Sequence, residues 1–283
     1  MTSSKFPEVH WVHPTGGWPS FSPDGTQIVF NIGNALWIIN TDGTKLRRLY
    51  PAEGSKDTAT RADWSWNPDW IAFSLNEQEI WVIHPDGTGA APYYTGTNAP
   101  AGVAMYYPSW YRDLSALVAV GYTNQNTPST GAELYRMTPD SITPLTKSPH
   151  PVAGRPSVNP DGTKIAFAGN WGKYQQVENQ IWIVAPPADP TRLEPGNQFA
   201  YQGRSPNWSP KGDRIVFEST RPTVDPTNQT PLAIYVIDSD GKHPRAITDV
   251  EAYSATHAEW NRQQTQVVFQ GSGKGIGIID HPK

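Results

Sequence analysis

Cysteine is absent from the 283 residues, so the fold contains no disulfide bond and the chain has no thiol chemistry. Charged residues make up only 17% of the chain and leave a net charge of −4. Proteins that bind nucleic acids need a basic field, and this charge balance argues against that role. No apolar run approaches the roughly 18 residues that a membrane-spanning helix needs. A strong helical pattern is also missing.

The first seven residues lack the apolar segment of a signal peptide. We therefore expect a cytoplasmic protein, or a periplasmic or secreted one whose signal peptide has been removed. The absence of cysteine fits both compartments. We further expect a soluble monomer that has no nucleic-acid partner and no membrane span.

One short pattern recurs along the chain and indicates its architecture. An aromatic strand end precedes a Pro-Asp-Gly or similar turn, and a β-branched strand follows. The clear copies are residues 20–30, 157–167 and 207–217. Six units, spaced about 44 to 52 residues apart, are anchored at Pro23, Pro68, Arg112, Pro160, Pro210 and Arg262. A repeat of this length and content is typical of a β-propeller.

Each unit contains a further segment rich in β-branched and aromatic residues, which suits the third strand of a blade. These segments are 35–39, 79–83, 133–137, 180–184, 233–237 and 275–279. An Asp-Gly turn often follows, and a weaker fourth strand ends the unit. We therefore predict an all-β fold, a six-bladed β-propeller of four-stranded antiparallel blades, and a single domain over residues 1–283.

The sixth unit stops after its third strand, whereas segment 8–13, with the pattern of a strand, precedes the first unit. We predict that this N-terminal strand completes the last blade and closes the ring. Closure removes the exposed sheet edges that would otherwise promote aggregation.

The repeat resembles that of the TolB-type propellers, a family similar to the WD-repeat proteins. The fifth unit is the most similar copy, with Trp208-Ser209-Pro210, the strand at 215–217 and Ile-Tyr-Val-Ile-Asp at 234–238. The resemblance extends over nearly the whole chain. It implies a propeller fold and does not specify an activity.

The two faces of the predicted propeller carry different loops. Turns after the first and third strands are short and regular. The connections at the other face include residues 122–131, 169–179 and 219–232, which are long and irregular. Functional residues concentrate on irregular loops carried by a rigid scaffold. We therefore expect a site on the irregular face, around the mouth of the axial channel.

Side chains near the start of each first strand are expected to surround this mouth as ligand-binding residues. They are Trp18, Arg61, Asp63, Tyr106, Tyr107, Arg155, Arg204 and His257. Arginine matches carboxylates and phosphates, and aromatic faces stack on ligands. Cations held together repel one another, so the cluster requires interleaved acids such as Asp63 and Glu259, or a bound anion. Alternatively, these residues fill the channel and pair only with each other and with water.

No motif in the chain specifies a catalytic residue, a cofactor or a metal site. The seven histidines are scattered, and no pair has metal-ligand spacing with a third ligand. There is no Gly-x-Ser-x-Gly, and the glycine-rich segment 271–275 matches neither a P-loop nor a dinucleotide fingerprint. We predict no catalytic residue, no cofactor and no metal.

The hypothesis is a non-catalytic recognition module that binds a small polar or anionic ligand, a glycan or a protein partner on the irregular face. The alternative is a propeller enzyme, a lyase or a hydrolase, with an acid/base or metal site at the channel mouth. That reading needs His257 together with Asp63, Glu259 or an arginine. A scaffold for protein partners is a third reading. The mouth has one histidine and more arginines, which favours binding.

Overall fold

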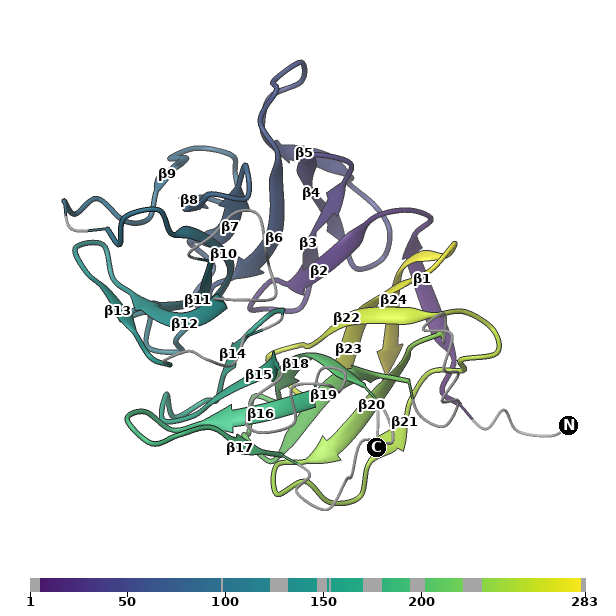
Figure 1. Ribbon diagram of the computed structural model, residues 1–283. Coiled ribbons are helices and arrows are strands. Elements are labelled where there is room, and N and C mark those ends of the chain that lie inside the picture. The colour runs from purple at the N-terminus through teal and green to yellow at the C-terminus, as the bar shows by residue number, and fades with distance from the viewer. Residues whose placement is uncertain are drawn as a thin grey trace, which may run out of the picture.

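The computed structural model describes residues 6–97, 99–122, 132–146, 152, 154–169, 180–193, 202–220 and 231–280. Within them, 24 strands form six four-stranded antiparallel sheets around a central axis, and no helix occurs (Figure 1). The predicted all-β, six-bladed propeller is confirmed. No helix in this part of the chain is long and apolar enough to span a membrane.

Blades one to three follow the order of the chain, each with its first strand at the axis. Blade one contains β2 (Gly17–Phe21), β3 (Gln27–Ile32), β4 (Ala35–Asn40) and β5 (Arg47–Tyr50). Blade two contains β6 (Ala59–Trp64), β7 (Ile71–Leu75), β8 (Glu79–Ile83) and β9 (Ala91–Pro92). Blade three contains β10 (Ala104–Trp110), β11 (Leu117–Tyr122), β12 (Ala132–Met137) and β13 (Ile142–Pro144).

Blades four and five repeat the plan, and blade six combines the two ends of the chain. Blade four contains β14 (Ser157–Val158), β15 (Ile165–Gly169), β16 (Gln180–Val184) and β17 (Thr191–Arg192). Blade five contains β18 (Gly203–Trp208), β19 (Arg214–Ser219), β20 (Ala233–Asp238) and β21 (Arg245–Ala246). Blade six contains β22 (Ala255–Trp260), β23 (Gln266–Gly271), β24 (Gly275–Asp280) and β1 (Val9–His13).

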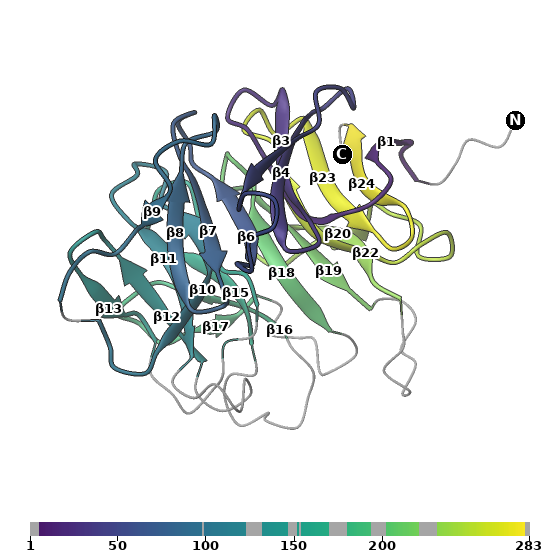
Figure 2. The same ribbon diagram turned by 90° about the horizontal axis from the view of Figure 1, so that it is seen from above.

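The N-terminal strand closes the ring as predicted. β1 pairs antiparallel with β24, with Val9 opposite Ile279. Figures 1 and 2 show the purple β1 beside the yellow β24 from two directions. Trp11 of β1 packs edge-on against Phe269 at a centroid distance of 5.7 Å, so the closing strand also contributes to the core.

The core consists of apolar layers between neighbouring blades. In five blades, the second strand directs a fully buried phenylalanine at the preceding blade. These residues are Phe30, Phe73, Phe167, Phe217 and Phe269. Burial of one such side chain stabilises the fold by about 1.5–3 kcal/mol. Blade three has Ala119 at this position, so its interface with blade two lacks the aromatic ring.

Candidate functional site at the mouth of the axial channel

The first strands line the axial channel. β2, β6, β10, β14, β18 and β22 contact one another in a closed circle around the axis (Figure 1). Their register with the second strands defines sets of six equivalent residues. We call the set nearest the irregular face the upper ring: Trp18, Arg61, Tyr107, Arg155, Ser205 and His257. The set two residues further along is the middle ring: Ser20, Asp63, Ser109, Ser157, Asn207 and Glu259.

The upper ring has an unusual backbone. Five of its six residues have φ between +47° and +58°, and four of these five carry a large side chain, namely Trp18, Arg61, Tyr107 and His257. Each of these strands shifts register at this point, which is the signature of a β-bulge. A positive φ costs a residue with a side chain on the order of 1–3 kcal/mol. Such strain concentrates at functional sites, so this ring is the candidate site.

Polar side chains on the second strands hold this backbone in place. Asn31 Oδ1 accepts a hydrogen bond from the Arg61 backbone N–H at 3.0 Å, across the boundary between blades one and two. Glu218 Oε1 likewise accepts from the His257 backbone N–H at 2.7 Å. A buried polar group without a partner is costly, and these bonds satisfy donors that the bulge removes from the sheet.

Side chains of the middle ring bind five of the blades to the next blade around the circle. Asp63 Oδ2 accepts a hydrogen bond from the Trp110 backbone N–H at 2.9 Å, and Glu259 Oε1 accepts from the Phe21 backbone N–H at 3.1 Å. Three further bonds of this kind involve Ser20, Ser157 and Asn207. Asp63, predicted as a ligand-binding residue, therefore has a structural role one level below the mouth.

Arg155 crosses the channel beneath the mouth. Its side chain is buried, and Nη2 lies 2.8 Å from Asp63 Oδ1 and 2.5 Å from Glu259 Oε2. Burial alone would lower the pKa of Arg155, but the two carboxylates outweigh it and raise that pKa. We expect either interleaved acids or a bound anion to offset the repulsion between the arginines. For Arg155, two acids do so. The Arg155 guanidinium lies below the mouth, where two carboxylates balance its charge, and it is not accessible to a ligand.

Arg61 is the arginine that faces the mouth. Its guanidinium carbon lies 4.6 Å from the ring centre of Tyr107, 5.4 Å from that of Trp18 and 5.7 Å from that of Tyr106. Its Nη1 lies 2.9 Å from Glu77 Oε1, but the Glu77 side chain is 60% exposed. Exposed ion pairs are worth only about 0–1 kcal/mol. Glu77 therefore holds the Arg61 guanidinium only weakly.

His257 packs against Trp18, with 3.5 Å between ring centres and an angle of 31° between the ring planes. Its Nδ1 lies 3.1 Å from Gln270 Oε1, and its Nε2 lies 3.9 Å from Glu218 Oε1. Burial lowers the pKa of His257 from 6.5, and Glu218 only partly opposes this effect. The imidazole is therefore neutral at neutral pH and able to accept a proton.

The other two predicted residues lie next to the upper ring. Tyr106 stacks on Tyr122 with 4.2 Å between ring centres, and burial raises the pKa of Tyr106 to about 12, so its hydroxyl stays protonated. Arg204 donates a hydrogen bond to Gln202 Oε1. The bulge in β18 gives the ring position to Ser205, one residue after the predicted Arg204.

Three further residues at the mouth are not predicted from the sequence. Glu77 lies in the turn between β7 and β8, and Glu218 and Gln270 lie on second strands. The sequence does contain one indication that Glu218 has a special role. Glu218 is a charged residue directly after the buried apolar segment Ile215, Val216 and Phe217. Its partner, His257, belongs to the next blade, and this proximity follows only from the ring.

The long connections predicted to surround the mouth, 122–131, 169–179 and 219–232, lie largely outside the described residues. The equivalent connections of blades one, two and six are short turns at 33–34, 76–78 and 272–274. Across the ranges that the structure describes, no three His, Asp or Glu side chains gather as metal ligands.

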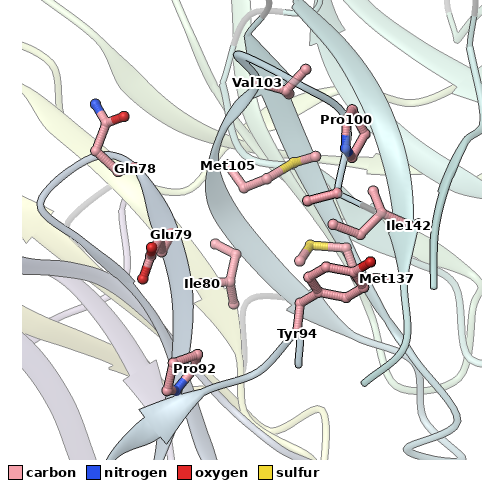
Figure 3. Close-up of a pocket in the computed structure, with 11 residues that line it drawn as sticks. Gln78, Glu79, Ile80, Pro92, Tyr94, Pro100, Val103, Met105, Met137 and Ile142 are labelled. Carbon is pink, nitrogen blue, oxygen red and sulfur yellow. The ribbon is translucent and has the colours of Figure 1, made fainter. Parts of the chain in front are cut away.

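A pocket of about 370 Å³ lies away from the mouth, between blades two and three (Figure 3). Ile80, Met105, Met137 and Ile142 line it. Three of these residues share an apolar cluster with Ala119, the residue that replaces the interface phenylalanine. The pocket thus occurs in the one inter-blade layer without that aromatic ring.

No family model matches the chain. An uncharacterized protein of Agrobacterium fabrum is 26% identical over 245 residues, which cover 82% of this chain and 75% of that protein. Many solved structures are similar in fold, among them the following three. A protein assigned as TolB from Agrobacterium tumefaciens has a TM-score of 0.66 and 18% identity, over 99% of this chain and all of the other.

The second is an oligogalacturonate lyase from Vibrio parahaemolyticus, with a TM-score of 0.64 and 13% identity over 99% and 95% of the two chains. The third is a gluconolactonase from Xanthomonas campestris, with a TM-score of 0.69 and 13% identity over 98% and 90%. Binding proteins and enzymes thus share this architecture, and similarity at this level shows the fold alone. The chain has the fold of the TolB-type six-bladed propellers.

Proposed function

We propose that the chain is a recognition module that binds a small ligand carrying a carboxylate, of the acidic-sugar class, at the mouth of the channel. The observation that carries this proposal is the position of Arg61, which lies among three aromatic rings and holds only one exposed acid. An arginine fork matches a carboxylate, and the aromatic faces suit the apolar side of a ring-shaped ligand.

The charges at the mouth support an acidic ligand. Arg155 is already neutralised by two buried carboxylates, so it does not compete for the ligand. Arg61 is 19% exposed and has Glu77 as its ion-pair partner. A ligand carboxylate that replaces Glu77 would keep the guanidinium paired and would add ring contacts with Trp18 and Tyr107.

The fold comparison supports the choice of acidic sugars among anions. Among the structures with this fold are two named for oxidised sugars, oligogalacturonate and gluconolactone. Their sequence identity to this chain is 13%. They therefore suggest which class of ligand to test first and do not assign a ligand.

Isothermal titration calorimetry with galacturonate, digalacturonate, gluconate and neutral galactose tests the proposal. We expect the acidic sugars to bind and galactose to bind more weakly. The substitution Arg61→Gln should weaken binding about 10- to 100-fold, because it removes a charge-assisted hydrogen bond. Glu77→Gln should strengthen binding, because it removes the competing carboxylate.

Arg48→Gln is a matched control, since Arg48 lies 5.9 Å from the ring centre of Trp37, away from the mouth. It should leave binding unchanged. If no acidic sugar binds, or if Arg61→Gln binds as the native chain does, the acidic-sugar proposal is wrong. Binding of galactose with equal affinity would show that the aromatic rings, and not Arg61, recognise the ligand.

The neutral state of His257 supports a second candidate function, a lyase or hydrolase that acts on the same ligand. A neutral imidazole 3.9 Å from a carboxylate is a suitable general base. Turnover of digalacturonate, followed by absorbance of an unsaturated product or by release of reducing ends, would support it. His257→Gln should then abolish turnover and preserve binding. Binding without turnover favours the recognition module.

A further inference from the structure

A third set of equivalent residues lies at the opposite end of the channel. In each blade, one backbone N–H closes the turn after the first strand, for example that of Ser22 or Asn261. The residue directly after this donor belongs to the set. We call this set the lower ring: Pro23, Trp66, Arg112, Pro160, Pro210 and Arg262. Three blades place a proline here, and the other three place one tryptophan and two arginines.

The two arginines reach across the channel and share the tryptophan. The guanidinium carbon of Arg262 lies 4.1 Å from the ring centre of Trp66, and that of Arg112 lies 4.7 Å from it. Arg262 Nη2 donates to the Trp64 carbonyl at 2.6 Å, from blade six to blade two. Arg112 Nη1 makes a longer contact of 3.4 Å with the Pro210 carbonyl, from blade three to blade five.

Neither arginine has an ion-pair partner among the described residues. The Nε of Arg262 is buried without a hydrogen-bond acceptor. Burial lowers the pKa of Arg262, and the more distant Glu259 and Asp63 offset this effect only in part. The pKa of Arg155 is raised instead, because both carboxylates contact its guanidinium directly.

Arg155, the middle ring and the lower ring together carry one more positive than negative charge. Asp63 and Glu259 balance Arg155 and Arg262, so the exposed Arg112 adds one uncompensated positive charge at the open end. The nearest acid in sequence, Asp113, is turned into its own loop, where Oδ1 accepts from the Ser115 backbone N–H at 3.0 Å. The buried carboxylates lie deeper in the channel and would repel an anion that entered further.

We propose that Arg112, Arg262 and Trp66 form a second binding site, for a small oxyanion, at the end of the channel opposite the mouth. Arginine forks bind carboxylate, phosphate and sulfate with paired hydrogen bonds. The ligand would occupy the lower ring at the surface, where Arg112 is exposed. This site does not depend on the function proposed for the mouth.

Equilibrium dialysis with radiolabelled sulfate, at low ionic strength, tests the site directly. We expect one sulfate per chain, displaced by inorganic phosphate or by citrate. Arg112→Gln should weaken sulfate binding about tenfold or more, because a charge-assisted hydrogen bond is lost. Arg112 is exposed, so this variant should fold, and its thermal unfolding without anions serves as the check.

Two controls separate this site from other sources of binding. Arg48→Gln removes another arginine near a tryptophan and should bind sulfate as the native chain does. Arg61→Gln removes the arginine at the mouth and should also bind it normally. Displacement by phosphate alone identifies an inorganic ligand, and displacement by citrate alone identifies a carboxylate, and either supports the site. No binding, or equal binding by Arg112→Gln, overturns it.

Discussion

At the scale of single residues, the channel shows how similar side chains acquire different roles. Arg155 and Arg61 both belong to the upper ring, yet Arg155 is 5% exposed and touches two buried carboxylates, whereas Arg61 faces one exposed acid. Removal of one partner from a buried ion pair leaves an uncompensated charge, which is far more costly than loss of a surface pair.

We therefore expect Arg155→Ala to lower the free energy of unfolding by about 3–5 kcal/mol at pH 7, and Arg61→Ala by about 0–1 kcal/mol through its ion pair. Urea denaturation of both variants measures the difference. In Arg155→Ala, burial should favour the neutral form of Glu259, so part of the loss should be recovered as the pH falls toward 4. Similar losses for both variants would contradict the roles assigned to the two arginines.

His257 predicts a pH dependence of stability. Its folded-state pKa lies below 6.5 because it is buried, whereas the unfolded chain takes up the proton near pH 6.5. The stability associated with this group is therefore present above pH 6.5 and is lost as the pH falls from 6.5 toward the folded-state pKa. Denaturation at pH 7.5 and 5.5 should show a smaller acid loss in His257→Gln than in the native chain. Identical losses would show that His257 is solvated.

At the scale of elements, turn chemistry fixes the blades. Gly25, Gly162 and Gly212 have φ near +75° in the turn after the first strand, where an Asp-Gly or Lys-Gly pair occurs. Blades three and six place Leu114 and Gln264 at this position, also with positive φ. The geometry therefore persists without glycine, and this explains why the repeat remains intact where its sequence signature is lost.

Gly162→Val should cost about 1–3 kcal/mol of stability, because valine is β-branched and this position requires a positive φ. Thermal or urea unfolding measures the cost. The same substitution at Gly17, which has no positive φ, is not a suitable control, since a side chain there would meet Gln270. Unchanged stability would contradict a strained turn.

The closing strand gives a second prediction at this scale. Deletion of residues 1–14 removes β1 and exposes the edge of β24. We expect a lower melting temperature or aggregation, because an unpaired edge promotes pairing with other chains. Melting temperature and light scattering of the shortened chain are the measurements. A monomer that melts like the full chain would show that β1 is dispensable for closure.

At the scale of the whole molecule, the sequence predicts the ring better than the site. Turn residues and β-branched strands act locally, so the six blades and the closing strand were predictable. The upper ring was partly predictable, because Trp18, Arg61, Tyr107 and His257 open equivalent strands.

The remaining features of the site depend on neighbouring blades. Glu218 and Gln270 meet His257 only because the blades form a circle. The ion pairs of Arg155 with Asp63 and Glu259 join blade four to blades two and six. Arg155 and Glu259 are 104 positions apart in the chain, and no local pattern records such a contact.

The most direct test of the account is a crystal structure of the protein with digalacturonate at saturating concentration. We predict a ligand carboxylate within about 3 Å of the Arg61 guanidinium. Glu77 should be displaced, a sugar ring should lie against Trp18 or Tyr107, and the bonds of Arg155 to Asp63 and Glu259 should be unchanged. A mouth without ligand, with the Arg61–Glu77 pair intact, would contradict the account.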